Sequence, residues 1–302
     1  MKNPSHVILI RPANFGFNSE TATSNKFQQF IQDDESSIKA LCEFDSMVTV
    51  LKSNQISTTV FEDTIESIKP DAIFPNNWIS THPSGTITLY PMEALNRRLE
   101  RRNDVVDYIK DLGFNQQIDL TESEKNGQFL EGTGSVIFDP NQHDAYACIS
   151  SRTDVKLFES LCEALSFTPI SFVAEDVNGN PIYHTNVMLS IGQHIVVVCS
   201  ESIMDPIERA MVMHRLQIGN REVIDVTFSQ MSRFACNCLE VNDALGNPHL
   251  IMSSTAYNAF SIDEINRIQQ VVNIIAVDIP TIESIGGGSA RCMLLGVITP
   301  SN

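Results

Sequence analysis

Residues 186–198 read NVMLSIGQHIVVV and carry the pattern that decides the fold. Two apolar runs flank a short turn at Gly192, which is typical of an antiparallel hairpin. The same strand, turn and strand pattern occurs at residues 78–90, 134–149 and 235–252. A fifth copy is expected from the strand after Cys292 together with residues 7–10. Repeated units that cannot bury their own faces must pack against one another.

Segments with helical periodicity lie between the hairpins, at about 36–52, 93–112, 154–165, 205–216 and 261–272. Extended segments precede the later hairpins, for example 71–74, 223–226 and 276–279. The unit is therefore hairpin, helix and strand, repeated about five times. This pattern predicts an α/β protein built as a five-bladed α/β propeller with an axial cavity, with residues 1–302 forming a single domain. The alternative is a generic α/β sheet protein.

Composition indicates a soluble globular protein, with 302 residues, 42% hydrophobic and 19% charged. The net charge of −17 argues against nucleic acid or an anionic membrane as partner. The apolar run at residues 7–10 is too short for a signal peptide, and no stretch is long enough to span a bilayer. We therefore expect a cytoplasmic protein with reduced cysteines, a small-molecule substrate, no metal or cofactor, and a possible homo-oligomer.

A glycine-rich loop, Gly286 to Gly288, leads into Cys292, and an apolar run at residues 293–298 follows. A thiol thus stands where a permissive loop meets a buried strand. The neighbouring Arg291 would favour the nucleophilic thiolate. A free cysteine is more often a small buried hydrophobe, so this cysteine needs partners before a catalytic role is indicated.

Two polar clusters at the starts of central hairpins offer such partners. Glu131 is flanked by Leu130 and glycines at the mouth of an apolar strand, unlike a solvated glutamate. His184 and Asn186 would point to one face if their segment is extended. A thiolate that attacks carbon needs a proton carrier and a group that orients it. The alternative roles are a turn cap for Glu131 and a core position for His184. The histidines beside hairpin turns are expected to be exposed, namely His82, His143 and His194.

Two further clusters suggest substrate contacts. Asn77 directly precedes the first hairpin strand, although Pro75-Asn76-Asn77 also suits a turn. Arg97 and Arg98 belong to a basic helix start that is expected to be mostly solvated. One of these arginines turned inward would clamp a carboxylate through two hydrogen bonds.

Together these motifs resemble the pentein superfamily of guanidine-modifying enzymes. The resemblance covers the whole chain, and its motifs are Leu130 to Gly134, His184 to Asn186, and Gly286 to Cys292. It implies the five-bladed α/β propeller, with Cys292 as nucleophile, His184 as proton carrier and Glu131 as the catalytic acid. Residues 11–18 (which include Asn14), 76–80 and 90–98 are most similar to the citrulline-utilisation hydrolase branch of the arginine deiminase-related amidinotransferases.

The departures from the family pattern carry the substrate argument. Deiminases of this family hold the guanidinium cation with two aspartates, and the matching positions here are Asn77 and Asn186. An amide bonds either end of a neutral ureido group. The resemblance therefore implies hydrolysis of citrulline to ornithine, CO2 and ammonia through a covalent Cys292 intermediate. Asn77, Asn186 and Asn14 would contact the substrate, and Arg97 or Arg98 its α-carboxylate.

Several alternatives stay open at this point. An arginine dihydrolase also handles a ureido intermediate, and a deiminase or an amidinotransferase would use the same nucleophile. A non-catalytic binding protein of the same fold is the alternative from a different functional class. It is disfavoured because a binding protein has no need of Cys292, His184 and Glu131 together.

Overall fold

The computed structural model describes residues 3–31, 35–139 and 141–300. These residues form five sheets of three strands each, all with the same build. An antiparallel hairpin carries a third strand parallel to one of its members. The sheets consist of β15 (Leu295–Val297), β1 (His6–Arg11) and β2 (Ser57–Glu62); β3 (Ile79–His82), β4 (Thr86–Leu89) and β5 (Gln116–Asp119); β6 (Val136–Asp139), β7 (Asp144–Cys148) and β8 (Thr168–Phe172); β9 (Leu189–Ile191), β10 (Ile195–Val198) and β11 (Glu222–Asp225); and β12 (Leu239–Asn242), β13 (Pro248–Ser253) and β14 (Asn273–Val277).

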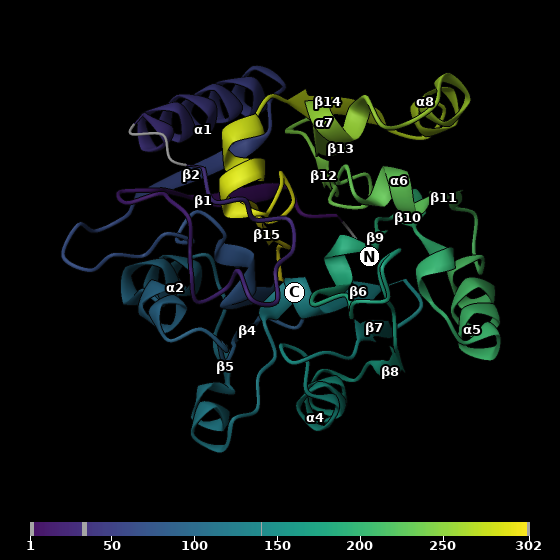
Figure 1. Ribbon diagram of the computed structural model, residues 1–302, viewed down its shortest axis with the longest axis horizontal. Coiled ribbons are helices and arrows are strands. Elements are labelled where there is room, and N and C mark those ends of the chain that lie inside the picture. The colour runs from purple at the N-terminus through teal and green to yellow at the C-terminus, as the bar shows by residue number, and fades with distance from the viewer. Residues whose placement is uncertain (1–2, 32–34, 140, 301–302) are drawn as a thin grey trace.

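The longer helices lie on the outside and connect each hairpin to its third strand (Figure 1). They are α1 (Ser36–Ser53), α2 (Asn103–Asp111), α4 (Val155–Leu165), α5 (Pro206–Leu216) and α8 (Ile262–Gln269). Side-chain caps fix where three of them begin, because Asp154, Asp205 and Ser261 accept the first free backbone N–H groups. The capping box expected at Ser261 and Glu264 is present. Short helices and turns are α3 (Gly132–Ser135), α6 (Phe228–Met231), α7 (Ser254–Tyr257), η1 (Pro75–Asn77), η2 (Asn96–Glu100), η3 (Thr121–Asn126), η4 (Thr185–Val187), η5 (Ser200–Ser202) and the π-turn η6 (Ile282–Gly286).

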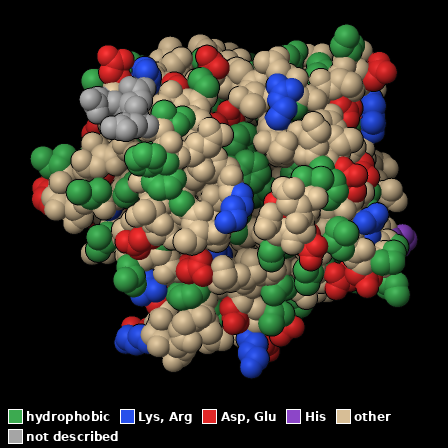
Figure 2. All heavy atoms as spheres, in the orientation of Figure 1, with side chains coloured by type: hydrophobic (Ala, Val, Ile, Leu, Met, Phe, Trp, Pro, Cys, Tyr) green, Lys and Arg blue, Asp and Glu red, His purple; other side chains and the backbone are tan. Residues whose placement is uncertain are grey.

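The sheets follow one another around the middle of the molecule, with one hairpin strand of each nearest the centre (Figure 1). Strand β15 contacts β3, and β9 contacts both β6 and β12. The amide N–H of Asn242 donates to Pro4 O at 2.8 Å and so links the fifth sheet to the first. The residues just before the inner strands are therefore collected in one region. In Figure 2 acidic and basic side chains are interspersed over the visible face, so the net charge of −17 forms no single patch there.

The expected hairpins are confirmed, including the fifth, in which β15 pairs antiparallel with β1. Three local predictions are wrong. Residues 71–74 form a turn, and the outer strand of the first sheet is β2, whose half-polar sequence gave little strand signal. The helix expected over 93–112 is broken at Arg101, whose backbone is extended. His82 is buried rather than exposed, with its ring against Phe138.

Candidate active site

Cys292 lies between the π-turn η6 and strand β15 and is buried. Its Sγ is 3.4 Å from Asn186 Nδ2 and 3.3 Å from Asn237 Nδ2. The Asn186 amide donates to the sulfur, and the Asn237 amide both donates to it and accepts from the thiol, with Oδ1 3.7 Å from Sγ. The sulfur therefore sits among polar donors, in contrast to Cys148 and Cys238, whose pKa is raised to about 12 by burial.

The glycine loop lets the segment that carries Cys292 pack tightly. A Cβ on Gly286 or Gly288 would lie 2.9 Å from the ring of Phe74. Gly287 has φ +64°, a conformation that favours glycine. The loop is thus clamped against the turn that precedes the second sheet, and this contact fixes where Cys292 lies.

His184 and Glu131 form a buried pair. Glu131 lies just before α3 and His184 just before η4, and the distance from His184 Nε2 to Glu131 Oε2 is 2.8 Å. The second carboxylate oxygen of Glu131 accepts the backbone N–H of Glu93 at 3.0 Å. Because Nε2 faces the carboxylate, Nδ1 is the ring nitrogen left for proton transfer. The arrangement is that of a proton carrier oriented by an acid.

Electrostatics give the two members of this pair different charge states. Burial lowers the pKa of His184 to about 4, against the hydrogen bond to Glu131, which raises it. The resting imidazole is therefore neutral near pH 7. Burial also acts against the charge of Glu131, but Arg152, the bond to His184 and Arg97 together hold the pKa of its carboxyl well below the usual range.

This pair predicts how stability changes with pH. An unfolded histidine binds a proton below its ordinary pKa of about 6.5, whereas folded His184 stays neutral down to about pH 4. The unfolding free energy is therefore expected to fall as the pH drops through this window, by about 2–3 kcal/mol for this one group. Urea unfolding between pH 7 and pH 4 measures it. His184→Gln should flatten the slope and His143→Gln, at an exposed site, should not; equal slopes in both variants would contradict the assignment.

The asparagines expected to contact the substrate lie in this region. Asn77 ends η1, donates to Glu131 O at 3.5 Å and accepts from Arg97 Nη1 at 3.0 Å. Asn186 belongs to η4 instead of continuing an extended segment from His184, so the expected shared strand face is wrong. Both asparagines are nevertheless buried close to the reactive groups.

The other residues expected to contact substrate differ in burial and in hydrogen bonding. Arg97 is buried and forms two 2.9 Å bonds to Glu100, so its basic segment is not simply solvated. Arg98 is half-buried and donates to the carbonyls of Met92 and Glu93. Asn14 Nδ2 is buried and has no partner within the described part of the chain. Their roles toward substrate stay predictions.

Sequence reasoning missed three residues of the site. Arg152 Nη1 lies 3.3 Å from Glu131 Oε2, and its guanidinium lies over the ring of Tyr183. Asp71 is buried, and its Oδ1 has no partner among the described residues. Asn237 contacts the sulfur, and a signal for it was available: it stands two residues before β12, as Asn77 stands two before β3.

Residues 18–29, the N-terminal strap, cross this side of the site. Asn25 Nδ2 donates to Gly287 O at 3.2 Å, so the strap holds the nucleophile loop. Arg152 Nη2 donates to Thr21 O at 3.0 Å, and Thr21 Oγ1 donates to Asp71 at 3.2 Å. One segment near the N-terminus thereby connects three of the sheets around the reactive groups.

Metal-binding groups and membrane-spanning helices are both absent from the described residues. Among the described residues, no three histidine, cysteine or acidic side chains are grouped so that they could hold a metal ion. Within the same ranges, every helix is too short or too polar to cross a bilayer.

The five-sheet frame carries a buried cysteine held by amides and a buried imidazole–carboxylate pair, and the chain is of the class of pentein hydrolases that act on carbon–nitrogen bonds. The model of the eukaryotic N,N-dimethylarginine dimethylhydrolase family matches residues 11–299. The chain belongs to this family. The predicted relation to penteins is thus confirmed.

Solved structures with the same fold share little sequence. The N-terminal domain of ArgZ, a cyanobacterial arginine dihydrolase, is 15% identical over 98% of both chains with a TM-score of 0.76; the chain spans only 41% of whole ArgZ. AgrE in complex with L-arginine is 14% identical, with 98% of this chain and 40% of AgrE covered and a TM-score of 0.77. A dimethylarginine dimethylaminohydrolase adduct with S-methyl-L-thiocitrulline is 17% identical over 97% of this chain and 100% of the other, with a TM-score of 0.67. No curated protein gives a significant match.

Proposed function

We propose that the protein is an arginine dihydrolase, which hydrolyses the guanidino group of arginine and then the resulting ureido group to give ornithine. The observation that carries this is the amide lining of Cys292 by Asn186 and Asn237. An amide oxygen accepts from a guanidinium, and an amide N–H donates to a ureido oxygen. The same lining therefore suits both successive substrates. Citrulline hydrolysis, the activity favoured by the sequence, is the second half of this reaction.

Asp71 supports an amino-acid substrate. A buried carboxylate oxygen without a partner is costly, and an ammonium group would satisfy it. Asp71 lies near Arg97, with Arg97 Nε 3.8 Å from its Oδ2. An amino acid bound here would place its α-ammonium group at Asp71 and its head toward Cys292. The proposal further takes the five sheets as blades of a closed α/β propeller, with this site on its axis.

The chemistry follows from the charge states. As the Cys292 sulfur attacks the guanidino carbon, neutral His184 takes the thiol proton, and the resulting imidazolium delivers that proton to the nitrogen that leaves as ammonia. Neutral His184 then takes a proton from water, which attacks the carbon of the Cys292 adduct and expels the thiolate, leaving a ureido group. A second round releases another ammonia and gives an N-carboxylated amine, which loses CO2. The amides of Asn186 and Asn237 stabilise negative charge on the departing sulfur, and Glu131 stabilises the imidazolium.

A substrate panel tests the proposal. Purified protein receives L-arginine, L-citrulline or asymmetric dimethylarginine separately, and ammonia, dimethylamine, citrulline and ornithine are quantified by mass spectrometry. Arginine is expected to yield ornithine and two ammonia, and citrulline to yield ornithine and one ammonia. Cys292→Ser serves as the inactive control. Arginine that stops at citrulline would rule out the second hydrolysis.

Hydrolysis of dimethylarginine is the second candidate, because the family model that matches residues 11–299 is that of the dimethylarginine hydrolases. In that case dimethylarginine alone would react, giving citrulline and dimethylamine. Product that forms only after an amine acceptor is added would instead identify amidino transfer. Inertness toward the whole panel would favour the non-catalytic alternative.

A further inference from the structure

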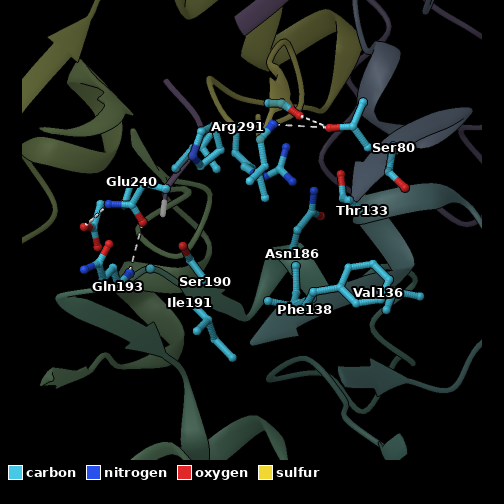
Figure 3. Close-up of a pocket in the computed structure, with 18 of the residues that line it drawn as sticks. Ser80, Thr133, Val136, Phe138, Asn186, Ser190, Ile191, Gln193, Glu240 and Arg291 are labelled. Carbon is cyan, nitrogen blue, oxygen red and sulfur yellow. Dashed lines mark hydrogen bonds between the residues drawn. The ribbon is translucent and has the colours of Figure 1, made fainter. Parts of the chain in front are cut away.

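A separate cavity of about 120 Å³ lies between the hairpins, and Arg291 points into it (Figure 3). Its wall is mostly apolar, with residues such as Val136, Phe138 and Leu189, and it includes a minority of hydroxyl and amide side chains, among them Ser80, Thr133, Asn186 and Ser190. The lining reaches partly exposed hairpin turns, so small solutes have a path from solvent.

Arg291 is a buried cation without an acidic partner. Its side chain is 9% exposed, and Nη1 donates to Leu294 O at 3.0 Å. Within residues 3–31, 35–139 and 141–300, its Nε and Nη2 make no hydrogen bond and no carboxylate lies within ion-pair distance. The two other strongly buried arginines of the centre are paired, Arg97 with Glu100 and Arg152 with Glu131. Burying an unpaired charge raises the free energy of the folded protein, so an anion beside Arg291 would stabilise it.

The other ionisable groups on the cavity do not supply it. Glu240 accepts from Asn3 Nδ2 and His194 Nδ1, both at 2.6 Å, on one oxygen. Its second oxygen accepts the backbone N–H of His194 at 2.9 Å. His82 is neutral, because burial lowers its pKa to about 3. The carboxylate of the wall is therefore already committed elsewhere, and its histidine carries no charge.

We propose that this cavity binds a small monovalent inorganic anion, such as chloride, against the guanidinium of Arg291. The free Nε and Nη2 donors supply charge-assisted hydrogen bonds to the anion. The site stands out because the chain as a whole carries a net charge of −17, which repels anions elsewhere.

The anion would act on the nucleophile. Arg291 is adjacent to Cys292 in the chain, and Asn186 both lines the cavity and contacts Cys292 Sγ. A free guanidinium favours the Cys292 thiolate, whereas an anion bound to that guanidinium offsets its charge. Occupancy is therefore expected to lower the fraction of Cys292 that is thiolate and to slow its reactions. This inference does not rest on the proposed substrate.

Cysteine alkylation tests the proposal without any substrate. The protein reacts with iodoacetamide near pH 7 while chloride replaces gluconate at constant ionic strength, and peptide mass spectrometry follows each cysteine. Chloride should slow alkylation of Cys292 by on the order of threefold. The exposed Cys42 is an internal control and should keep its rate. Arg291→Gln should abolish the chloride effect, whereas Arg233→Gln, which removes the same charge from an exposed site outside the cavity, should retain it.

Two outcomes would overturn the proposal: equal Cys292 rates in both salts, or a chloride effect that survives in Arg291→Gln. If Arg291→Gln does not fold, as judged by circular dichroism, bromide-soaked crystals of the unaltered protein decide. An anomalous peak beside Arg291 supports the site, and a cavity without one refutes it.

Discussion

Replacing Glu131 by glutamine is expected to lower kcat about 10²- to 10⁴-fold. The carboxylate accepts from His184 and lies 3.3 Å from Arg152, so glutamine removes the charge that stabilises an imidazolium at this position. It also leaves Arg152 with Glu93, 3.4 Å away, as its remaining carboxylate partner, which should reduce stability by about 1–3 kcal/mol. Steady-state kinetics on the substrate identified by the panel, together with urea unfolding, separate the two effects.

Glu124→Gln is the matched control. Glu124 also accepts a backbone N–H, from Met92, and also pairs with arginines, Arg101 and Arg98. It has no bond to His184, so its loss should reduce stability while kcat stays within about twofold. Comparable kcat values for Glu131→Gln and Glu124→Gln would refute the role assigned to Glu131.

Gly134→Ala is expected to reduce kcat/KM by about 10²-fold while the fold persists. A Cβ at this position would lie 2.4 Å from Asn77 Nδ2 and 2.8 Å from His184 Nδ1. Both atoms must therefore move, and His184 Nδ1 is the nitrogen assigned to proton transfer. Gly134 does not have a positive φ, so alanine strains the site more than the backbone.

Gly16→Ala provides the comparison, because its Cβ would meet no atom within 4 Å and its φ is not positive. It should keep both kcat/KM and the melting temperature. A Gly134→Ala enzyme with unchanged kcat/KM would show that the ring and the amide can shift without consequence, against the geometry proposed.

Much of the candidate site could be predicted because each of its main residues stands in a recognisable short sequence motif. Glu131, His184 and Cys292 each precede the first strand of a hairpin or its equivalent, and the repeat itself brings such positions together. The hairpins and most helices followed from periodicity and capping residues for the same reason. Substrate preference was less accessible, since Asn77 and Asn186 fit more than one head group.

The remainder depends on contacts between distant segments. Arg152 reaches Glu131 across 21 residues and the strap at Thr21 across 131 residues, and no local pattern marks it as inward-facing. Asp71 lies in a segment that was expected to be extended and forms a turn instead. Arg97 is buried because it bonds to Glu100. In the sequence both residues belong to a charged segment that is typical of a solvated helix start.

The antiparallel pairing of β15 with β1 has a consequence for biosynthesis. Domains begin to fold while the ribosome is still adding residues, so the first sheet waits with one edge of β1 unpaired until residue 297 has emerged. Cys292 arrives in that same last segment. A nascent or prematurely terminated polypeptide thus holds Glu131 and His184 without Cys292, and the cysteine chemistry proposed above becomes available only after β15 has been synthesised and has paired with β1.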